Sequence, residues 1–346
     1  MRCSRYQLKK LRNIVKKQKR FIDWFSLPVP EQVGLHPNYV KLLTSFVERL
    51  YEKVENGCSR IRLDFSKTEK MYSDGTLYLK ACLNDLVERF PNCHFSMVTP
   101  SETRVEQVLY QVGIAKLLGR MKSFDSSAFH HSVRHWHVAH GYDVNLENAE
   151  NIFDSFQGRL TPELSRSIYA GVSEAMTNCM HHAYEGENLP DACRKWWMFS
   201  REDATSGRLQ VVFCDLGIGI PKSLFRESEK VKDDWLDNLK KWIASHIASG
   251  KADDDALKIR AAIEIGRTRT KLQHRGKGLK QMVSTLDQIG DGDATVEIIS
   301  GNGMYRHRSR NKKVVEKALP LSDNRKTAIR GTLIQWSVPL PKRETE

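Results

Sequence analysis

The chain has 346 residues, of which 40% are hydrophobic and 28% are charged. This length and composition are typical of a folded protein of about two domains and exclude an intrinsically disordered chain. No run approaches the roughly 18 apolar residues that a membrane-spanning helix needs, so we expect no membrane span. The seven cysteines include no CxxC pair, which indicates reduced thiols in a cytoplasmic protein.

Positive charge is concentrated near the N-terminus. The formal net charge is +13, and residues 1–20 hold nine Lys or Arg but no Asp or Glu. We interpret residues 1–33 as a basic helical arm, because Leu8, Leu11 and Val15 fall on one stripe of a helix. Such an arm suits nucleic acid or an acidic protein, but no base-reading motif or aromatic platform supports nucleic acid. The segment also lacks the apolar core of a secretory signal.

Residues 34–125 alternate between helical and strand patterns. The periodicity predicts helices over 37–54, 77–90 and 101–119, with strands over 60–65 and 94–98. Strands separated by helices of this length indicate βαβ units, and therefore a first domain of the α/β class.

Three features of this domain resemble the STAS domain, the fold of anti-sigma-factor antagonists. They are a strand ending in LDFSKTEKMYSDG (63–75), a helix directly after it, and the phrase VTPSETRVEQVLYQVGIAKLLG (98–119). In that family the loop before the helix carries a phosphorylatable serine followed by glycine. Here Asp74 precedes Gly75, so the resemblance implies a fixed carboxylate and a domain that docks a protein partner. The alternative is that residues 73–75 are a turn that caps the next helix.

The segment FDSSAFHHSVRHWHVAHGYDVN (124–145) contains five of the twelve histidines. His135 and His137 would share one face of a strand, which is a spacing that metal sites can use. No cysteine or carboxylate stands nearby at ligand spacing. The pattern Val133-x-x-Trp136-x-Val138 instead favours a strand that enters the second domain.

The second domain, expected over residues 126–346, contains four segments with candidate chemistry. The first, SIYAGVSEAMTNCMHHAYEG (167–186), is predicted to be one helix whose apolar positions would face a core: Ile168, Val172 and Met176. Glu174, Asn178 and His182 recur at i, i+4 and i+8 and therefore line an adjacent face. A carboxylate one turn before an amide can activate water while the amide holds a metal ion. The alternative is a polar surface stripe.

The second segment is a buried-type strand, LQVVFCD (209–215), that runs directly into a glycine-rich loop. The loop reads Asp215-x-Gly217-x-Gly219-x-Pro221. Glycines at alternate positions permit positive φ and close backbone approach. The carboxylate at the strand end could accept a hydrogen bond from an exocyclic amine.

The third and fourth segments add a helix start and a terminal strand. Gly276-x-Gly278-Leu279 opens a helix predicted over 274–286, where free backbone N–H groups favour phosphate. The run is neither a Walker loop nor a Rossmann fingerprint. The strand predicted over 330–340 begins with Gly331-Thr332, whose hydroxyl could reach a bound ligand.

In this order the four segments closely resemble the GHKL (Bergerat-fold) ATPases, which include gyrase, heat-shock chaperones, histidine kinases and mismatch-repair proteins. The phrase VSEAMTNCMHHAY is especially similar to the anti-sigma-factor serine kinases of that superfamily. The resemblance spans residues 133–340. It implies an α/β (α+β) sandwich in which helices cover one face of a mixed sheet, with ATP and Mg²⁺ as ligands.

The resemblance also implies a role for each matching residue. Asn178 would be the Mg²⁺ ligand, and Glu174 would be the general base that activates water or a protein hydroxyl. Asp215 would accept the adenine amino group, while Gly217 and Gly219 would let the nucleotide lie close.

The remaining two segments would enclose the phosphates and the base. Glycines of the third segment would cap the phosphates and its basic residues would add positive charge: Arg275, Gly276, Lys277, Gly278 and Leu279. Thr332 would close the base pocket from the terminal strand. His182 matches the end of the first motif and is either a weak contact or a packed core histidine.

A long insert separates the second and third segments. Residues 222–274 include amphipathic patterns that predict helices over 233–250 and 256–266. In the family this region is the nucleotide lid; the alternative is a permanently packed scaffold. A second basic cluster, residues 304–313, lies in a hairpin predicted after Gly301-Asn302-Gly303 and is interpreted as a solvated loop. The alternative is a patch for an anionic partner, formed together with residues 1–20.

The leading functional hypothesis is an ATP- and Mg²⁺-dependent hydrolase that acts as a regulatory switch and meets a protein partner through the STAS-like domain. One alternative is an anti-sigma-type serine/threonine kinase, since STAS domains are the usual substrates of such kinases. Another is a module that binds nucleotide without catalysis. A homodimer and a nucleic-acid partner are further options.

Overall fold

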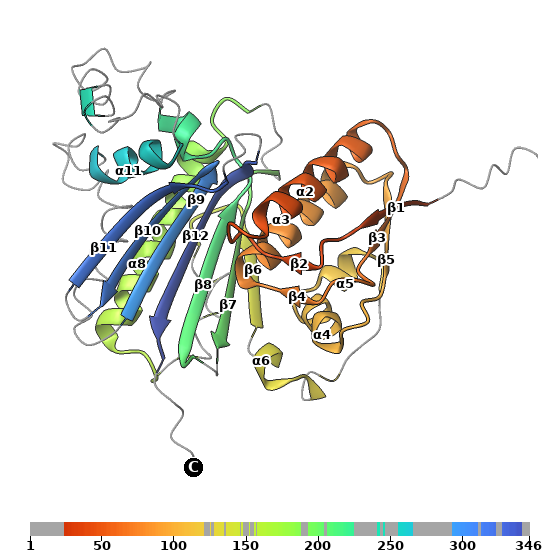
Figure 1. Cartoon of the computed structure of the whole chain (residues 1–346), viewed down its shortest axis with the longest axis horizontal. Coiled ribbons are helices and arrows are strands. Elements are labelled where there is room, and N and C mark those ends of the chain that lie inside the picture. The colour runs from red at the N-terminus through yellow and green to blue at the C-terminus, as the bar shows by residue number, and fades with distance from the viewer. Residues whose placement is uncertain are drawn as a thin grey trace, which may run out of the picture.

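The structure of the protein is a computed structural model whose fold is of the mixed α/β class (Figure 1). The N-terminal half comprises residues 24–120 and the C-terminal half comprises residues 128–340. The structure describes the following residues: 24–120, 125, 128–134, 136–145, 147, 152, 156, 158–187, 193–203, 206–224, 241–242, 245, 255–265, 293–310, 313–322 and 327–340.

The N-terminal half is built from parallel strands joined through helices, as the βαβ pattern predicts. A three-stranded parallel sheet has the order β1-β3-β5, and two short strands, β2 and β4, pair beside it. Its strands are β1 (Phe25–Pro28), β2 (Gln32–Val33), β3 (Arg60–Asp64), β4 (Lys70–Met71) and β5 (His94–Val98). Its helices are α2 (Val40–Glu55), α3 (Ser73–Arg89), α4 (Thr103–Gln111) and α5 (Ile114–Leu117).

The N-terminal half begins earlier than the sequence indicated. Strand β1 pairs in parallel with β3, and β2 pairs with β4, so residues 25–33 belong to this half and not to a helical arm. The basic stripe of residues 1–20 lies outside the described residues. The helix expected over 101–119 is divided into α4 and α5, because Gly113 adopts φ +78° between them. Helix α3 begins at Ser73, so residues 73–75 form its first turn.

The C-terminal half contains a seven-stranded sheet with the order β11-β10-β9-β12-β8-β7-β6. Its strands are β6 (Trp136–Gly141), β7 (Trp196–Asp203), β8 (Arg208–Asp215), β9 (Asp293–Gly301), β10 (Gly303–Arg310), β11 (Lys313–Pro320) and β12 (Ile329–Pro339). Every pairing in it is antiparallel. The expectation of a mixed sheet was wrong, because the crossover from β8 to β9 leaves room for β12, which pairs antiparallel with both strands.

Two helices cover one face of this sheet. They are α8 (Pro162–Asn178) and α11 (Asp255–Ile265), seen behind and above the strands in Figure 1. Ile168, Val172 and Met176 of α8 are buried in the core on this face, as their spacing predicts. Helix α11 matches the second helix predicted in the insert and packs against the same core; the first, over 233–250, lies largely outside the described residues. Within the described ranges no helix is long and apolar enough to span a membrane.

Helix α3 covers part of the opposite face and joins the two halves into one core. Its residues 75–84 are all buried, which fits a helix that is apolar on almost every side. Asn84 accepts the indole N–H of Trp197 at 3.2 Å, and the buried Lys195 ammonium lies 2.7 Å from both carboxylate oxygens of Glu88. A single apolar cluster therefore extends from β1 to β12, across the boundary expected near residue 125.

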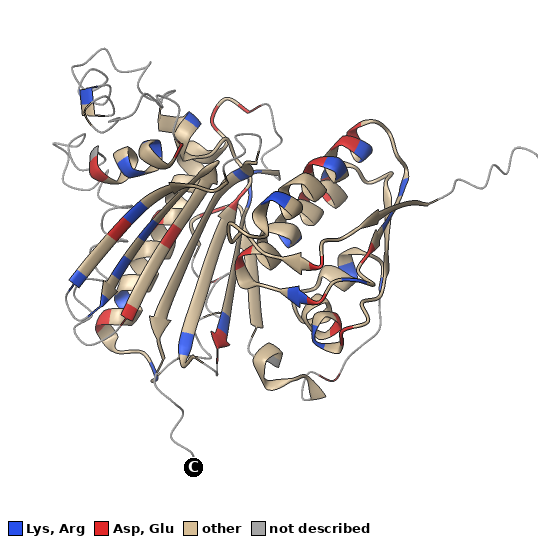
Figure 2. Ribbon diagram, viewed as in Figure 1, with Lys and Arg blue, Asp and Glu red and all other residues tan. Residues whose placement is uncertain are grey.

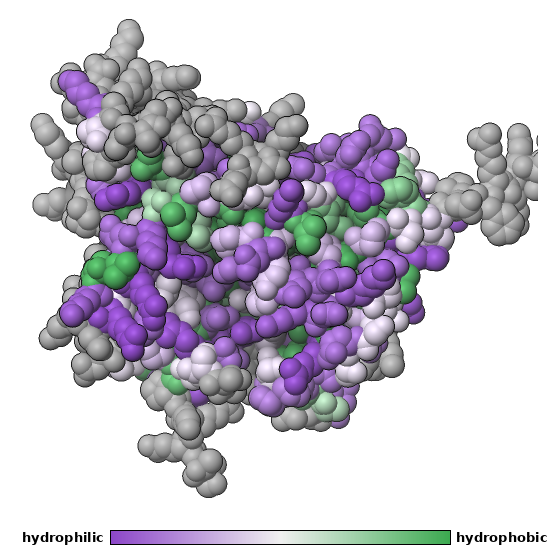
Figure 3. Space-filling view, in the orientation of Figure 1, coloured by the Kyte–Doolittle hydropathy of each residue, from purple (hydrophilic) through white to green (hydrophobic). Residues whose placement is uncertain are grey.

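The rest of that face, over β9, β10 and β12, is polar. A shallow groove there is lined by side chains of both charges and by neutral polar side chains: Arg208, Asp293, Thr295, Glu297, Arg308, Gln335 and Ser337. Figure 2 shows charged residues along these strands, and the side of the molecule facing the viewer in Figure 3 is largely hydrophilic. The basic segment expected to be a solvated loop is mostly strand β10, paired on both sides, although the predicted hairpin before it is present.

Close packing between α3 and the segment before α2 can be tested at Gly75. A Cβ atom there would lie 2.5 Å from backbone atoms of Gly34, so we expect Gly75→Ala to lower the free energy of unfolding by about 2–3 kcal/mol. Gly57→Ala is the control, because Gly57 has φ +81° but nothing within 4 Å, and should cost only about 1 kcal/mol of backbone strain. Urea unfolding measures both, and equal losses would contradict the packing argument.

Candidate functional site

Asp215 is a buried carboxylate at the carboxyl end of β8, in the middle of the seven-stranded sheet. The residue is only 5% exposed. Its Oδ1 accepts the backbone N–H of Gly217 at 2.9 Å, and the backbone N–H of Thr332 on the neighbouring strand also donates to the carboxylate. Burial raises the pKa of Asp215 to about 7, although both hydrogen bonds act in the opposite direction. Such a shift is typical of a functional carboxylate.

Ser300 completes the polar cluster from strand β9. Its hydroxyl donates to the carbonyl of Gly331 at 2.9 Å, accepts the N–H of Ile220 at 2.9 Å and lies 3.1 Å from the Thr332 hydroxyl. The residue is fully buried. Sequence reasoning missed Ser300, because a lone serine in a strand gives no signal before the partner strands are known.

The glycines of the site lie where chain segments approach too closely for a side chain. A Cβ on Gly217 would lie 2.0 Å from the carbonyl oxygen of Ala183, and one on Gly331 would lie 2.0 Å from the carbonyl oxygen of Asp215. Gly219 has φ +81°, and a Cβ there would lie 2.8 Å from the hydroxyl of Ser300. The glycine spacing is therefore required by contacts within the protein itself, before any ligand is considered.

Helix α8 carries the second group of predicted site residues. Thr161 precedes the helix and caps it by accepting the N–H of Leu164 at 3.3 Å. The α-helix ends at Asn178 and continues as one π-helical turn, Cys179–Ala183, where the sequence predicted an unbroken helix to residue 186. Single π turns are frequent at functional sites because they alter the direction of the side chains that follow.

Glu174 and Asn178 are brought together on α8, as their spacing predicts. Both are half-buried, and the two side chains are hydrogen-bonded to each other. Burial raises the pKa of Glu174, while the bond to Asn178 and the electrostatic interaction with nearby His182 act in the opposite direction. A carboxylate with a raised pKa is a stronger base at neutral pH, so this pair can hold and deprotonate a water molecule.

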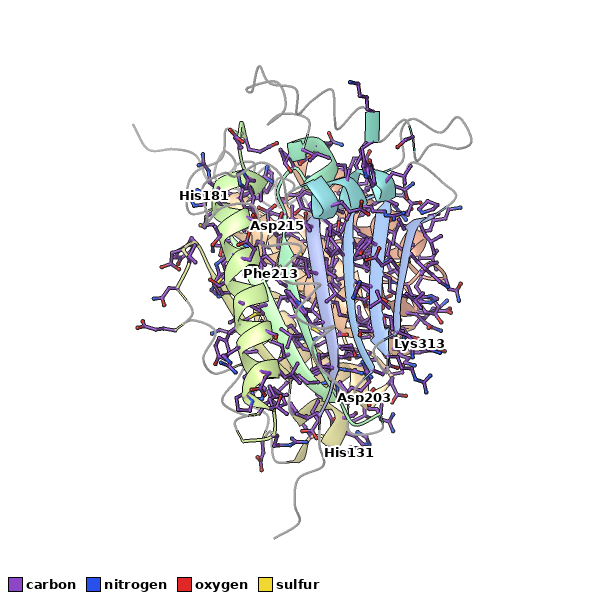
Figure 4. All side chains as sticks on the ribbon, turned by 90° about the vertical axis from the view of Figure 1, so that its left-hand side faces the viewer. His131, His181, Asp203, Phe213, Asp215 and Lys313 are labelled. Atoms are coloured by element: carbon purple, nitrogen blue, oxygen red, sulfur yellow. The ribbon has the colours of Figure 1, made fainter. Side chains whose placement is uncertain are left out.

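The π turn connects α8 to the loop that follows Asp215. The carbonyl of Ala183 accepts the N–H of Ile218 at 2.7 Å. The Tyr184 hydroxyl accepts the N–H of Leu216 at 3.1 Å and donates to the carbonyl of Lys195 at 2.6 Å. Figure 4 shows the consequence, with Asp215 and His181 at the same end of the sheet and of α8. Tyr184 is a second residue that sequence reasoning missed.

The third predicted segment lies outside the described residues, so its phosphate-capping role is a sequence-based expectation: Arg275, Gly276, Lys277, Gly278 and Leu279. Thr332, from the fourth segment, is buried and lies directly opposite Asp215 in the β8–β12 ladder. The structure thus brings the first, second and fourth segments together.

The histidine-rich segment does not form a metal centre in the described part of the chain. His131 lies on the short helix α6 (His131–Arg134), while His137 lies on β6, which begins at Trp136 and not at Val133. Among the described residues no group of three or more His, Cys, Asp or Glu side chains could hold a metal ion.

Comparisons with known proteins gave no match, either to protein-family models, to curated proteins or to solved structures. The function is therefore inferred from the geometry of the site.

The raised pKa of Asp215 predicts how stability depends on pH. An unfolded Asp loses its proton near pH 3.8, whereas folded Asp215 retains it to about pH 7, so stability present in acid is lost as pH rises through 7. The loss begins near pH 4 and is complete near pH 7. Three pKa units correspond to about 4 kcal/mol in all, of which about 3 kcal/mol falls between pH 5 and pH 8, and Asp215→Asn should remove most of this part.

Asp64 provides the matched control, because it also ends a strand but its pKa is lowered by hydrogen bonds with Ser66. Its ionisation is complete below pH 5, so Asp64→Asn should leave the pH dependence of urea unfolding unchanged from pH 5 to pH 8. If the free energy of unfolding changes with pH at the same slope in Asp215→Asn and Asp64→Asn, Asp215 does not titrate in this range.

Proposed function

We propose that this chain binds ATP with Mg²⁺ and hydrolyses it as a GHKL-type ATPase, acting as a nucleotide-dependent regulatory switch. The observation that carries the proposal is the buried Asp215 carboxylate, placed at a strand end in the same region as the Glu174–Asn178 pair. The order of the segments along the chain supports the finer assignment of a Bergerat fold, although the antiparallel sheet departs from the mixed sheet expected of it.

The acceptor groups of the site suit an adenine nucleotide. Above about pH 7 the ionised Asp215 carboxylate offers about four acceptor positions, and the two backbone N–H groups on it leave capacity for the exocyclic amine of adenine. The Thr332 hydroxyl lies on the adjacent strand and would contact the same ring. Arg275, Gly276, Lys277, Gly278 and Leu279 would hold the phosphates; this part of the proposal rests on sequence alone.

The side-chain oxygens of Asn178 and Glu174 are hard ligands of the type that Mg²⁺ prefers. When bound, the cation would neutralise charge on the phosphates. Asn178 would hold it, and Glu174 would orient a water molecule and accept its proton. The half-burial of Glu174, which raises its pKa, suits it to that role.

Two observations favour hydrolysis over self-phosphorylation of the STAS-like half. Ser73 is 5% exposed and its hydroxyl donates to Gln210 of β8 at 2.9 Å, so it is not available to a kinase in this fold. The Asp74 carboxylate accepts the N–H groups of Leu35 and Gly75, so its role is to hold the start of α3. The remaining surface of this half would then serve a protein partner.

The six cysteines among the described residues are free, which supports a cytoplasmic location.

Site variants separate binding from turnover. In calorimetry with MgATP we expect wild type to bind and Asp215→Asn to lose measurable binding, because its amide presents a donor to the adenine amine. Glu174→Gln should keep binding but lose about 10²–10⁴-fold in phosphate release, which is the usual contribution of a general base. Glu163→Gln, on the exposed first turn of α8, is the control and should match wild type.

The γ-labelled nucleotide identifies the reaction. Release of free phosphate without labelled protein is the expected result. Label on a serine of the protein would replace the hydrolase with a kinase. If the protein binds nucleotide but forms neither free phosphate nor labelled protein, and Glu174→Gln binds equally well, the chain is a nucleotide-binding module without catalysis. If wild type does not bind nucleotide, the nucleotide site is refuted.

A further inference from the structure

The N-terminal half contacts the backbone of strand β12 immediately before the proposed base pocket. The phenol oxygen of Tyr78, on α3, accepts the backbone N–H of Arg330 at 3.1 Å. Arg330 is followed directly by Gly331 and Thr332. Tyr78 is 1% exposed, so this hydrogen bond is shielded from water and has no solvent substitute.

The contact falls on an irregularity in the strand. Ile329 lies opposite Gly301 of β9, whereas Thr332 lies opposite Ser300, so residues 330–331 form a bulge. Bulges occur next to active sites, where they redirect the side chain that follows. The Gly331 carbonyl of this bulge accepts the Ser300 hydroxyl, while the Arg330 N–H donates to Tyr78. Tyr78 of the N-terminal half and Ser300 of the C-terminal half therefore both hold this bulge in place. The bulge in turn sets the position of Thr332.

A second chain of contacts runs from α3 to the opposite side of the pocket. Glu88 forms an ion pair with the Lys195 ammonium at 2.7 Å, and Lys195 is 6% exposed. The Lys195 carbonyl accepts the hydroxyl of Tyr184 at 2.6 Å, and that hydroxyl accepts the N–H of Leu216 at 3.1 Å. Leu216 directly follows Asp215. The same helix thus reaches both strands that would enclose the base.

We infer that helix α3 is a positioning element of the nucleotide site, acting through Tyr78 on the β12 bulge and through Glu88 on the loop after Asp215. The inference rests on the proposed function, because it assigns regulation to that same site. Any partner that moves α3 changes the affinity for nucleotide, and by linkage nucleotide changes the affinity for that partner by the same factor. The N-terminal half would therefore be part of the nucleotide site in addition to its role in docking.

The closing experiment removes one oxygen atom from the full-length chain. Tyr78→Phe keeps the ring but leaves the Arg330 N–H without its acceptor. We expect the Kd for a non-hydrolysable ATP analogue with Mg²⁺ to rise about fivefold to tenfold, the range that follows from one buried hydrogen bond.

Tyr51→Phe is the matched control. Tyr51 is also 1% exposed, and the bond that its hydroxyl makes to Asp85 at 2.8 Å stays within the N-terminal half. The phenyl ring remains under the guanidinium of Arg330, 3.9 Å from its centroid. The Kd of Tyr51→Phe for the ATP analogue should equal that of wild type, even if thermal unfolding shows that Tyr51→Phe and Tyr78→Phe lose similar stability.

Amide hydrogen exchange in the nucleotide-free protein gives a readout that does not depend on binding. The amides of residues 330–332 should exchange faster in Tyr78→Phe than in Tyr51→Phe. Exchange at wild-type rate in Tyr78→Phe would overturn the inference, as would an unchanged Kd. A wild-type protein that binds no nucleotide would instead refute the proposed function, while exchange would still show whether Tyr78 holds the bulge.

A second variant tests the other chain of contacts. Glu88→Gln removes the charge that pairs with Lys195, so we expect a weaker nucleotide affinity and faster exchange at residues 215–217. Glu48→Gln, an exposed carboxylate on α2, is its control and should change neither. Identical behaviour of the two glutamine variants would remove Glu88 from the positioning role.

Discussion

A carboxylate buried at the end of β8 constrains the structure around it. Burying a charged group without hydrogen-bond partners costs several kcal/mol, so Asp215 requires donors from the chain. The N–H of Gly217 requires the loop to turn back at once, and the N–H of Thr332 requires β12 to pair with β8. The turn of the loop after β8 and the pairing of β12 with β8 therefore both supply hydrogen-bond donors to the Asp215 carboxylate.

The glycines and Ser300 follow from the same requirement. Gly217 and Gly331 lie where the turning loop and the paired strand meet backbone oxygens at a distance that excludes a side chain. Ser300 then satisfies the Gly331 carbonyl and the Ile220 N–H, which the irregular backbone leaves without strand partners. The hydrogen bonds of this polar cluster are thus made within the protein itself.

Local pattern predicted much of this structure, because alternation and helical spacing depend on near neighbours. Strands β5 and β8 and the buried face of α8 were found in this way. Ser300 and Tyr184 were missed because their roles depend on segments far apart in the sequence. Strand β1 was assigned to a helical arm, since a four-residue strand that ends at Pro28 and is followed by Pro30 carries little strand signal. The antiparallel sheet was missed because strand order is a property of tertiary pairing.

Helix α3 has a consequence for how the molecule folds and how it can change in evolution. It is buried on nearly every side, between helices α2 and α5 of one half and strands β7, β8 and β12 of the other. Removing either half would expose an apolar helix or an apolar sheet face to water, so the two halves should unfold in one cooperative transition. If recombination replaced the N-terminal half with one from another protein, the face of β7, β8 and β12 that packs against α3 would have to change with it.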